Sequence, residues 1–126
     1  MAELDLRPVV WLGNSRKNMQ EFPKKVRIDI GAALFTAQCG EIAEHVKPFK
    51  GVRSGVFEIV DRYNKDAYRL VYGVQIGEKL YVLHAFQKKS KSGIATPKPD
   101  IELIKQRYKE AQEHVKYGWQ EEKRKA

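Results

Sequence analysis

The stretch that decides the fold is residues 56–76, VFEIVDRYNKDAYRLVYGVQI. It contains two runs rich in β-branched and aromatic residues, at positions 56–63 and 67–76. The Asn-Lys-Asp segment at positions 64–66 lies between them, and such polar residues favour a turn. The pattern therefore predicts two antiparallel strands joined as a hairpin.

Charged residues interrupt both strands of this hairpin. Because side chains alternate across a strand, Glu58 and Arg62 fall on one face of the first strand. Arg69 points away from the tyrosines and leucine beside it, and we expect it to share the face of Glu58. An arginine in mid-strand must find a partner or lie on an open face. Two interpretations follow: an ion pair with Glu58 or Asp61, or a clamp for a phosphate group.

The remaining sequence adds a strand on each side of the hairpin and three helices. Residues 8–12 form a short apolar run that ends at Gly13, and residues 79–86 are apolar on both faces, as expected of a central strand. A helical pair follows the first strand, because Pro23 interrupts one helix and opens another. Pro97 opens the last helix. The apolar stripe of that helix consists of Ile101, Ile104, Tyr108, Ala111 and Val115.

These elements predict an α+β fold with a small antiparallel sheet, an N-terminal helical pair packed on one face and a C-terminal helix, in the order β-α-α-β-β-β-α. We expect the helical layer on one face of the sheet and the basic residues on the opposite, open face. The length of 126 residues suits one domain. We place that domain at residues 1–119 and expect residues 120–126 to fray, since they hold no core-forming side chain.

Composition argues for a cytoplasmic protein without membrane contact. No apolar run approaches the roughly 18 residues that span a bilayer. The acidic residues 1–5 lead into no signal-type apolar segment. Cys39 is the single cysteine and cannot form an internal disulfide, which fits a reducing compartment.

Positive charge is concentrated where strands are expected. Residues 47–99 hold 11 Lys/Arg and 4 Asp/Glu, a net charge of +7 out of +8 for the chain. A local positive field of this kind captures a polyanion such as RNA. The expected contacts to an RNA backbone are Lys50, Arg53, Arg62, Lys88 and Lys91. Ordinary surface solvation is the alternative interpretation of these clusters.

The sequence contains no pattern for a metal or a cofactor. It has no cysteine–histidine spacing typical of zinc and no glycine-rich phosphate loop, so we expect metal-independent chemistry and no cofactor. Glu58 could accept a proton or orient Arg69, and the orienting role is favoured. His84 alternates with Val82 and Phe86 along its strand, which favours a packed polar group over an acid or base.

The block from Val46 to about Ala111 resembles the RelE/ParE toxin superfamily and, within it, the phage-derived HigB-like branch. The resemblance lies in Lys47-Pro48-Phe49-Lys50-Gly51, Val56-Phe57-Glu58-Ile59, Tyr68-Arg69-Leu70-Val71-Tyr72, Leu83-His84-Ala85-Phe86-Gln87-Lys88-Lys89 and Thr96-Pro97. It implies the toxin of a type II toxin–antitoxin system, which cleaves mRNA on the ribosome. It also implies a cognate antitoxin, often one with a helix-turn-helix DNA-binding domain.

The resemblance implies roles for two residues and leaves the acid and base open. It places Arg69 and Lys89 at the scissile phosphate. RelE-like toxins carry lysines on the preceding strand, where this chain has Glu58 and Val60. The chain also lacks a secure counterpart of their tyrosine near the final helix. Two alternatives remain: a ParE-like toxin that acts on DNA gyrase without nuclease activity, and a non-catalytic RNA-binding module.

Overall fold

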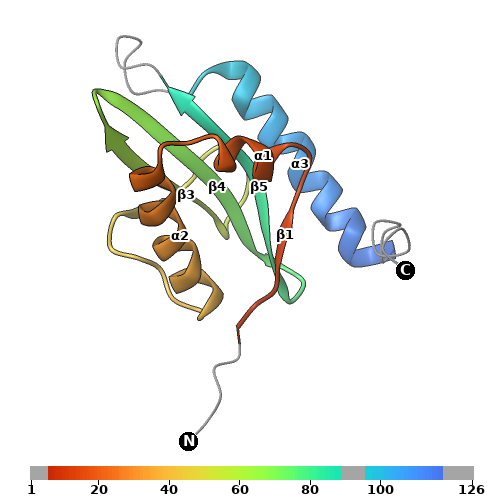
Figure 1. The fold of residues 1–126 in the computed structure, drawn as a ribbon. Helices are drawn as coiled ribbons and strands as arrows, with labels where there is room; N and C mark the ends of the chain where they lie inside the picture. The colour runs from red at the N-terminus through yellow and green to blue at the C-terminus, as the bar shows by residue number, and fades with distance from the viewer. Residues whose placement is uncertain (1–5, 89–95, 118–126) are drawn as a thin grey trace, which may run out of the picture.

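The computed structural model describes residues 6–88 and 96–117 (Figure 1). The expected tail at 120–126 therefore lies outside the described residues. In chain order the elements are β1 (Val9–Trp11), α1 (Ser15–Gln20), α2 (Lys24–Gln38), β2 (Val46–Pro48), β3 (Val56–Tyr63), β4 (Asp66–Ile76), β5 (Lys79–Lys88) and α3 (Lys98–Tyr117). This arrangement confirms the expected α+β class.

The five strands form one sheet in the order β1-β5-β4-β3-β2. β1 pairs with β5 in parallel, whereas the other neighbours are antiparallel. The sheet is therefore mixed: the expected antiparallel pairing is found at every pair of neighbours except β1 and β5. β2 was not predicted, because three residues are too short a run to show a period.

The β3–β4 hairpin closes through a two-residue turn. Tyr63 pairs with Asp66, and both intervening residues have positive φ angles, 52° at Asn64 and 70° at Lys65. Two successive positive φ angles define the type I′ turn, whose twist matches that of a hairpin. The hairpin predicted from residues 56–76 is confirmed.

One face of the sheet packs against α2. Val26, Ile30 and Ala33 of this helix are buried and share a core with Ile59 and Leu70 of the sheet. The spacing of these helix residues follows the 3.6-residue period, so a single helix face enters the core. Gly40, with φ of 92°, follows the helix end.

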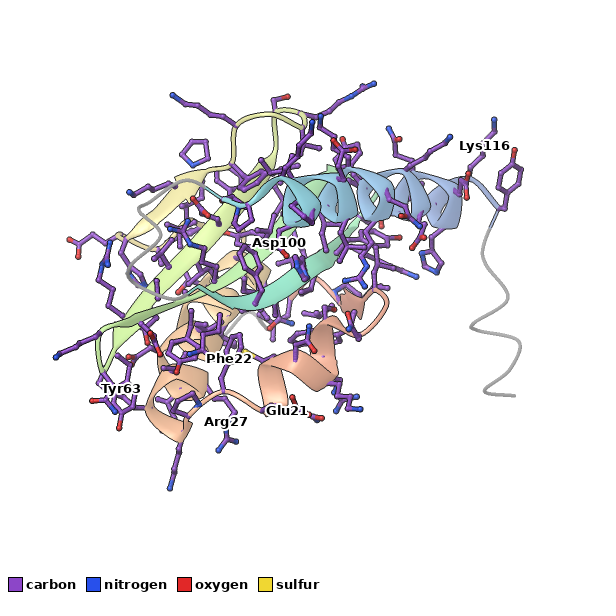
Figure 2. All side chains as sticks on the ribbon, turned by 90° about the horizontal axis from the view of Figure 1, so that it is seen from above. Glu21, Phe22, Arg27, Tyr63, Asp100 and Lys116 are labelled. Atoms are coloured by element: carbon purple, nitrogen blue, oxygen red, sulfur yellow. The ribbon has the colours of Figure 1, made fainter. Side chains whose placement is uncertain are left out.

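The opposite face is not open, because α3 packs on it. Figure 2 shows α3 and α2 on opposite sides of the sheet. On the α3 side, a second hydrophobic core includes Ile104, Tyr108 and Ala111 of this helix. Val115 was expected in this apolar stripe but is 47% exposed. His114 is buried in its place, and its Nδ1 lies 2.6 Å from the hydroxyl of Tyr81.

Arg107 fastens α3 to the other end of the chain. Its side chain is buried, with Nη1 donating to the carbonyl of Leu83 at 3.0 Å and Nη2 to Oδ1 of Asn14 at 2.9 Å. The guanidinium lies so close to Gly13 that a Cβ there would come within 2.4 Å of Nη2. Asn14 therefore binds Arg107, and its side chain makes no cap hydrogen bond to α1.

We expect Tyr72→Phe to preserve or raise stability. Tyr72 is fully buried, its hydroxyl has no hydrogen-bond partner within the described ranges, and burial raises its pKa to about 12. Removing an unpaired polar group saves its desolvation cost, so the free energy of unfolding should rise by up to about 1 kcal/mol. Tyr81→Phe is the matched control, and it should lose about 1 kcal/mol because its hydroxyl bonds His114. Urea unfolding measures both, and a loss at Tyr72 as large as that at Tyr81 would contradict the assignment.

Candidate functional site

Arg69 and Glu58 form a buried ion pair on the face that α3 partly covers. Nη1 of Arg69 donates to Oε2 of Glu58 at 2.8 Å, and the two side chains are only 8% and 13% exposed. Their strands are neighbours, with Glu58 opposite Val71 and Arg69 opposite Val60. The sequence named Glu58 and Asp61 as alternative partners of Arg69, and the structure shows Glu58 bound to it.

Strand register brings further candidate residues to the same end of the sheet. Arg62 of β3 pairs with Ala67 of β4, and Ala67 pairs with Lys88 of β5. Arg69 lies two residues from Ala67 on the same face, because side chains alternate along the strand. Arg62 is exposed, and Lys88 is placed here by its backbone position alone. Three strands thus contribute basic positions to one end of the sheet.

Lys50 and Arg53 lie apart from that group. They belong to the loop between β2 and β3, where residues 48–57 line an open pocket of about 530 Å³. This loop joins β3 at Val56, six residues before Arg62, which corresponds to about 20 Å along an extended strand. The expected RNA contacts that the structure describes therefore fall into two groups at opposite ends of β3.

Two expected site residues, Lys89 and Lys91, lie outside the described residues. The convergence of Lys89 with Arg69 stays a prediction. Lys47, which has no expected role in the site, lies opposite Glu58 in the register of β2 and β3 and is exposed. Only the position of the unpredicted strand β2 could have shown this.

His84 forms a second polar pair on the α3 side of the sheet. A β-bulge puts Leu83 and His84 on the same face. Nε2 of His84 lies 2.8 Å from Oδ1 of Asp100, which is labelled in the first turn of α3 in Figure 2. Burial lowers the pKa of His84, despite the opposite effect of Asp100. A neutral ring then donates its Nε2 hydrogen to the carboxylate. His84 is 5% exposed and stacks on Phe86, so it is a packed polar group, as the sequence favoured.

Asp29 and Asp61 form an acidic pair on the opposite side, beside α2. Burial raises the pKa of Asp61, and the adjacent carboxyl of Asp29 adds to that rise. The hydrogen bond from Lys25, with its Nζ 2.7 Å from Oδ2 of Asp29, lowers the pKa of Asp29. Sequence reasoning missed this pair because 32 positions separate its members. A signal did exist, since Asp61 has the same strand parity as buried Ile59.

Residues 6–88 and 96–117 contain neither a cluster of metal-binding side chains nor a helix that could span a membrane. This part of the chain holds no group of three or more histidine, cysteine, aspartate or glutamate residues that could bind a metal ion. It also contains no helix with the length and apolar character needed to cross a membrane.

The fold and the site define a small α+β protein with a buried arginine–glutamate pair and basic positions along one sheet face. Residues 17–109, well over half of the chain, match the family described as Phage derived protein Gp49-like (DUF891). The chain belongs to this family. The resemblance to phage-derived proteins expected from the sequence is thereby confirmed.

Comparisons with individual proteins give a more distant picture. None of the curated proteins matches this chain. Among solved structures, a chain of the RelBE2 toxin–antitoxin complex from Mycobacterium tuberculosis is similar, with 16% sequence identity and a TM-score of 0.45. The alignment covers 72% of the present chain and 100% of the other.

Breaking the Arg69–Glu58 pair from one side should be far more costly than replacing both members. Arg69→Ala leaves Glu58 buried without this counter-ion, which typically costs about 3–5 kcal/mol. The double variant Arg69→Met/Glu58→Leu removes both charges and keeps apolar volume, so its stability should stay close to wild type. Urea unfolding of the two proteins checks this. Equal losses in the single and double variants would show that the pair does not act as a unit.

His84 should make stability depend on pH. Its pKa in the folded state lies below the ordinary 6.5, so the unfolded chain binds the proton more tightly. The free energy of unfolding should therefore fall as the pH drops from 6.5 through the folded-state pKa. His84→Gln should flatten this fall, because it removes the ring that takes up the proton. Unfolding curves at about pH 7.5 and about pH 5 measure the difference, and identical slopes in the wild type and the variant would refute it.

Proposed function

We propose that this protein is the toxin of a type II toxin–antitoxin system and a metal-independent endoribonuclease that cleaves mRNA on the ribosome. The proposal is supported by membership of a phage-derived family and by the RelE-like residues around Arg69 and Lys89. The basic positions along the α3-side face add the charge that an RNA backbone requires. A cognate antitoxin, of the helix-turn-helix type, is its partner.

The proposed reaction is an internal attack within the RNA. The ribose 2′-oxygen forms a bond to the adjacent phosphorus while the bond from phosphorus to the 5′-oxygen breaks. The 2′-hydroxyl proton leaves to a base, and the departing 5′-oxygen gains a proton. The products are a 2′,3′-cyclic phosphate and a 5′-hydroxyl. Arg69 and Lys89 would stabilise the charge that develops on the phosphoryl oxygens.

The observation that carries the proposal is the fixed guanidinium of Arg69. Its bond to Glu58 fixes its orientation on one face of the sheet. Lys47 and Arg62 lie on the same face, and both are exposed. A guanidinium has several N–H donors, so a phosphate would accept charge-assisted hydrogen bonds from it while Glu58 keeps the bond from Nη1. Glu58 then has the orienting role, because its carboxylate is already bound to Arg69. Lys50, Arg53, Lys88 and Lys91 would hold more distant parts of the RNA backbone.

The double variant Arg69→Met/Glu58→Leu separates catalysis from folding. It should remain folded, yet mRNA cleavage should fall about 100- to 1,000-fold, the usual effect of losing one transition-state donor. Primer extension on cellular mRNA after induction measures cleavage, and growth of the culture reports toxicity. Lys105→Met is the control, since it removes an exposed cation from α3 and should change neither.

Two other outcomes would replace the proposal. A folded double variant that still arrests growth with the same cuts would remove Arg69 from the reaction. Wild-type toxicity with DNA damage and intact mRNA would identify a gyrase inhibitor. A non-catalytic binding module would cause no growth defect on expression. Its affinity for RNA would fall by about 0.7 log units per phosphate contact for each tenfold rise in salt concentration.

A further inference from the structure

The outer face of α2 carries apolar side chains that no described residue covers. Ile28 and Phe35 are 60% and 48% exposed, and Ala32 and Cys39 are exposed as well. Positions 28, 32, 35 and 39 are three or four residues apart, so they lie on one helix face. We call them the outer stripe. The inner face of α2 is buried in the core, and a helix that is apolar on both faces is normally covered on both.

Neighbouring segments extend this apolar surface. Leu6 is 40% exposed, and the next residue, Arg7, donates its amide to the carbonyl of Gln38 at 3.0 Å. Gln38 returns a side-chain hydrogen bond to Arg7 at 2.9 Å, which holds this segment against the last turn of α2. Ile42, 53% exposed, follows the same helix. Apolar residues gathered in this way mark an interaction surface, whereas single scattered ones do not.

An acidic pocket adjoins the outer stripe. Its volume is about 400 Å³, and Ala32 belongs both to its lining and to the stripe. Asp29 and Asp61 both line it. Oδ2 of Asp61 is buried and receives no hydrogen bond from the described part of the chain. The remaining lining residues are Ala33, Thr36, Ala43 and His45.

The charged form of Asp61 is disfavoured in the free protein. Lys25 already pairs with Asp29, so Asp61 lies beside a second carboxylate and partly out of water. Both effects disfavour its charged form. A cation entering the pocket would reverse this, because it would neutralise the charge and donate a hydrogen bond to the carboxylate. The pocket is thus complementary to a basic side chain even though the whole chain carries +8.

We propose that the outer stripe and the acidic pocket form the docking site for an amphipathic segment of the antitoxin. Apolar side chains of that segment would cover Ile28 and Phe35, and one lysine or arginine would enter the pocket between Asp29 and Asp61. This inference rests on the proposed function, which requires an antitoxin. A second copy of this chain fits less well, because two molecules of charge +8 repel each other.

The apolar part of the site is tested with the full chain and the purified protein encoded by the neighbouring reading frame. Ile28→Ser/Phe35→Ser should weaken binding at least tenfold, as expected for central contacts of an interface. Val115→Ser is the matched control, because Val115 is as exposed as Phe35 but lies on α3. In the wild-type complex, maleimide labelling of Cys39, the single cysteine, should be slowed.

The acidic pocket is tested by measuring binding and stability of the same variant, because a structural role would lower both. Asp61→Asn should weaken binding about tenfold, the usual effect of losing a charge-assisted hydrogen bond. The same change should preserve or raise the melting temperature, since it removes a disfavoured charge. Glu113→Gln, at an exposed position of α3, should alter neither quantity. A loss of binding that accompanies a loss of stability would assign Asp61 a structural role instead.

Each remaining outcome has a distinct meaning. Normal binding by the Ile28→Ser/Phe35→Ser protein would overturn the docking site and leave the proposed function intact. Failure of the wild-type chain to bind would overturn the antitoxin and the site together. A dimer of the free chain that Phe35→Ser dissociates would assign the stripe to a second copy. If binding behaves as expected but mRNA stays intact, the docking site stands and the nuclease proposal fails.

Discussion

The ion pair between Arg69 and Glu58 constrains how β3 and β4 align and which side chains lie on one face of the sheet. A guanidinium in a buried strand cannot be left without a counter-charge, and β3 supplies one at 2.8 Å. The pair requires the β3–β4 register to be held, because a slip of one residue in either strand would move its charge to the opposite face, away from its partner. The two-residue turn at Asn64 and Lys65 fixes that register. The turn, the strand register and the ion pair therefore depend on one another.

The face beyond this pair shows how α3 is seated. The bulge in β5 turns both Leu83 and His84 toward the helix, so that the carbonyl of one and the ring of the other bind α3. Asp100 and Arg107 are their partners on the helix. Polar contacts thus fix the position of α3 along the strand, while Ile104 and its neighbours supply the apolar contact. The start of α3 is anchored at His84, which leaves the Arg62 end of the sheet beyond the helix.

Local patterns predicted the hairpin, most of the apolar stripe of α3 and the shared face of Glu58 and Arg69, because each depends on a period of 2 or 3.6 residues. Contacts between distant segments were not predictable in this way. Val115 and His114 fit the α3 stripe about equally well, and only the position of the Tyr81 hydroxyl decides between them. The pairing of Asp29 with Asp61 likewise depends on how α2 crosses β3. Of the proposed site, the ion pair was foreseen as an alternative, and the packing of α3 on the same face of the sheet was not.

The contact of Arg107 with the turn at Gly13 and Asn14 has a consequence for biosynthesis. β1 finds its partner strand only when β5 has been made, and the side chain of Asn14 finds its own only when residue 107 has emerged. Pairings across such a sequence separation form late, since loop closure must precede them. A nascent chain therefore cannot make both contacts until the segment around residue 107 has left the ribosome.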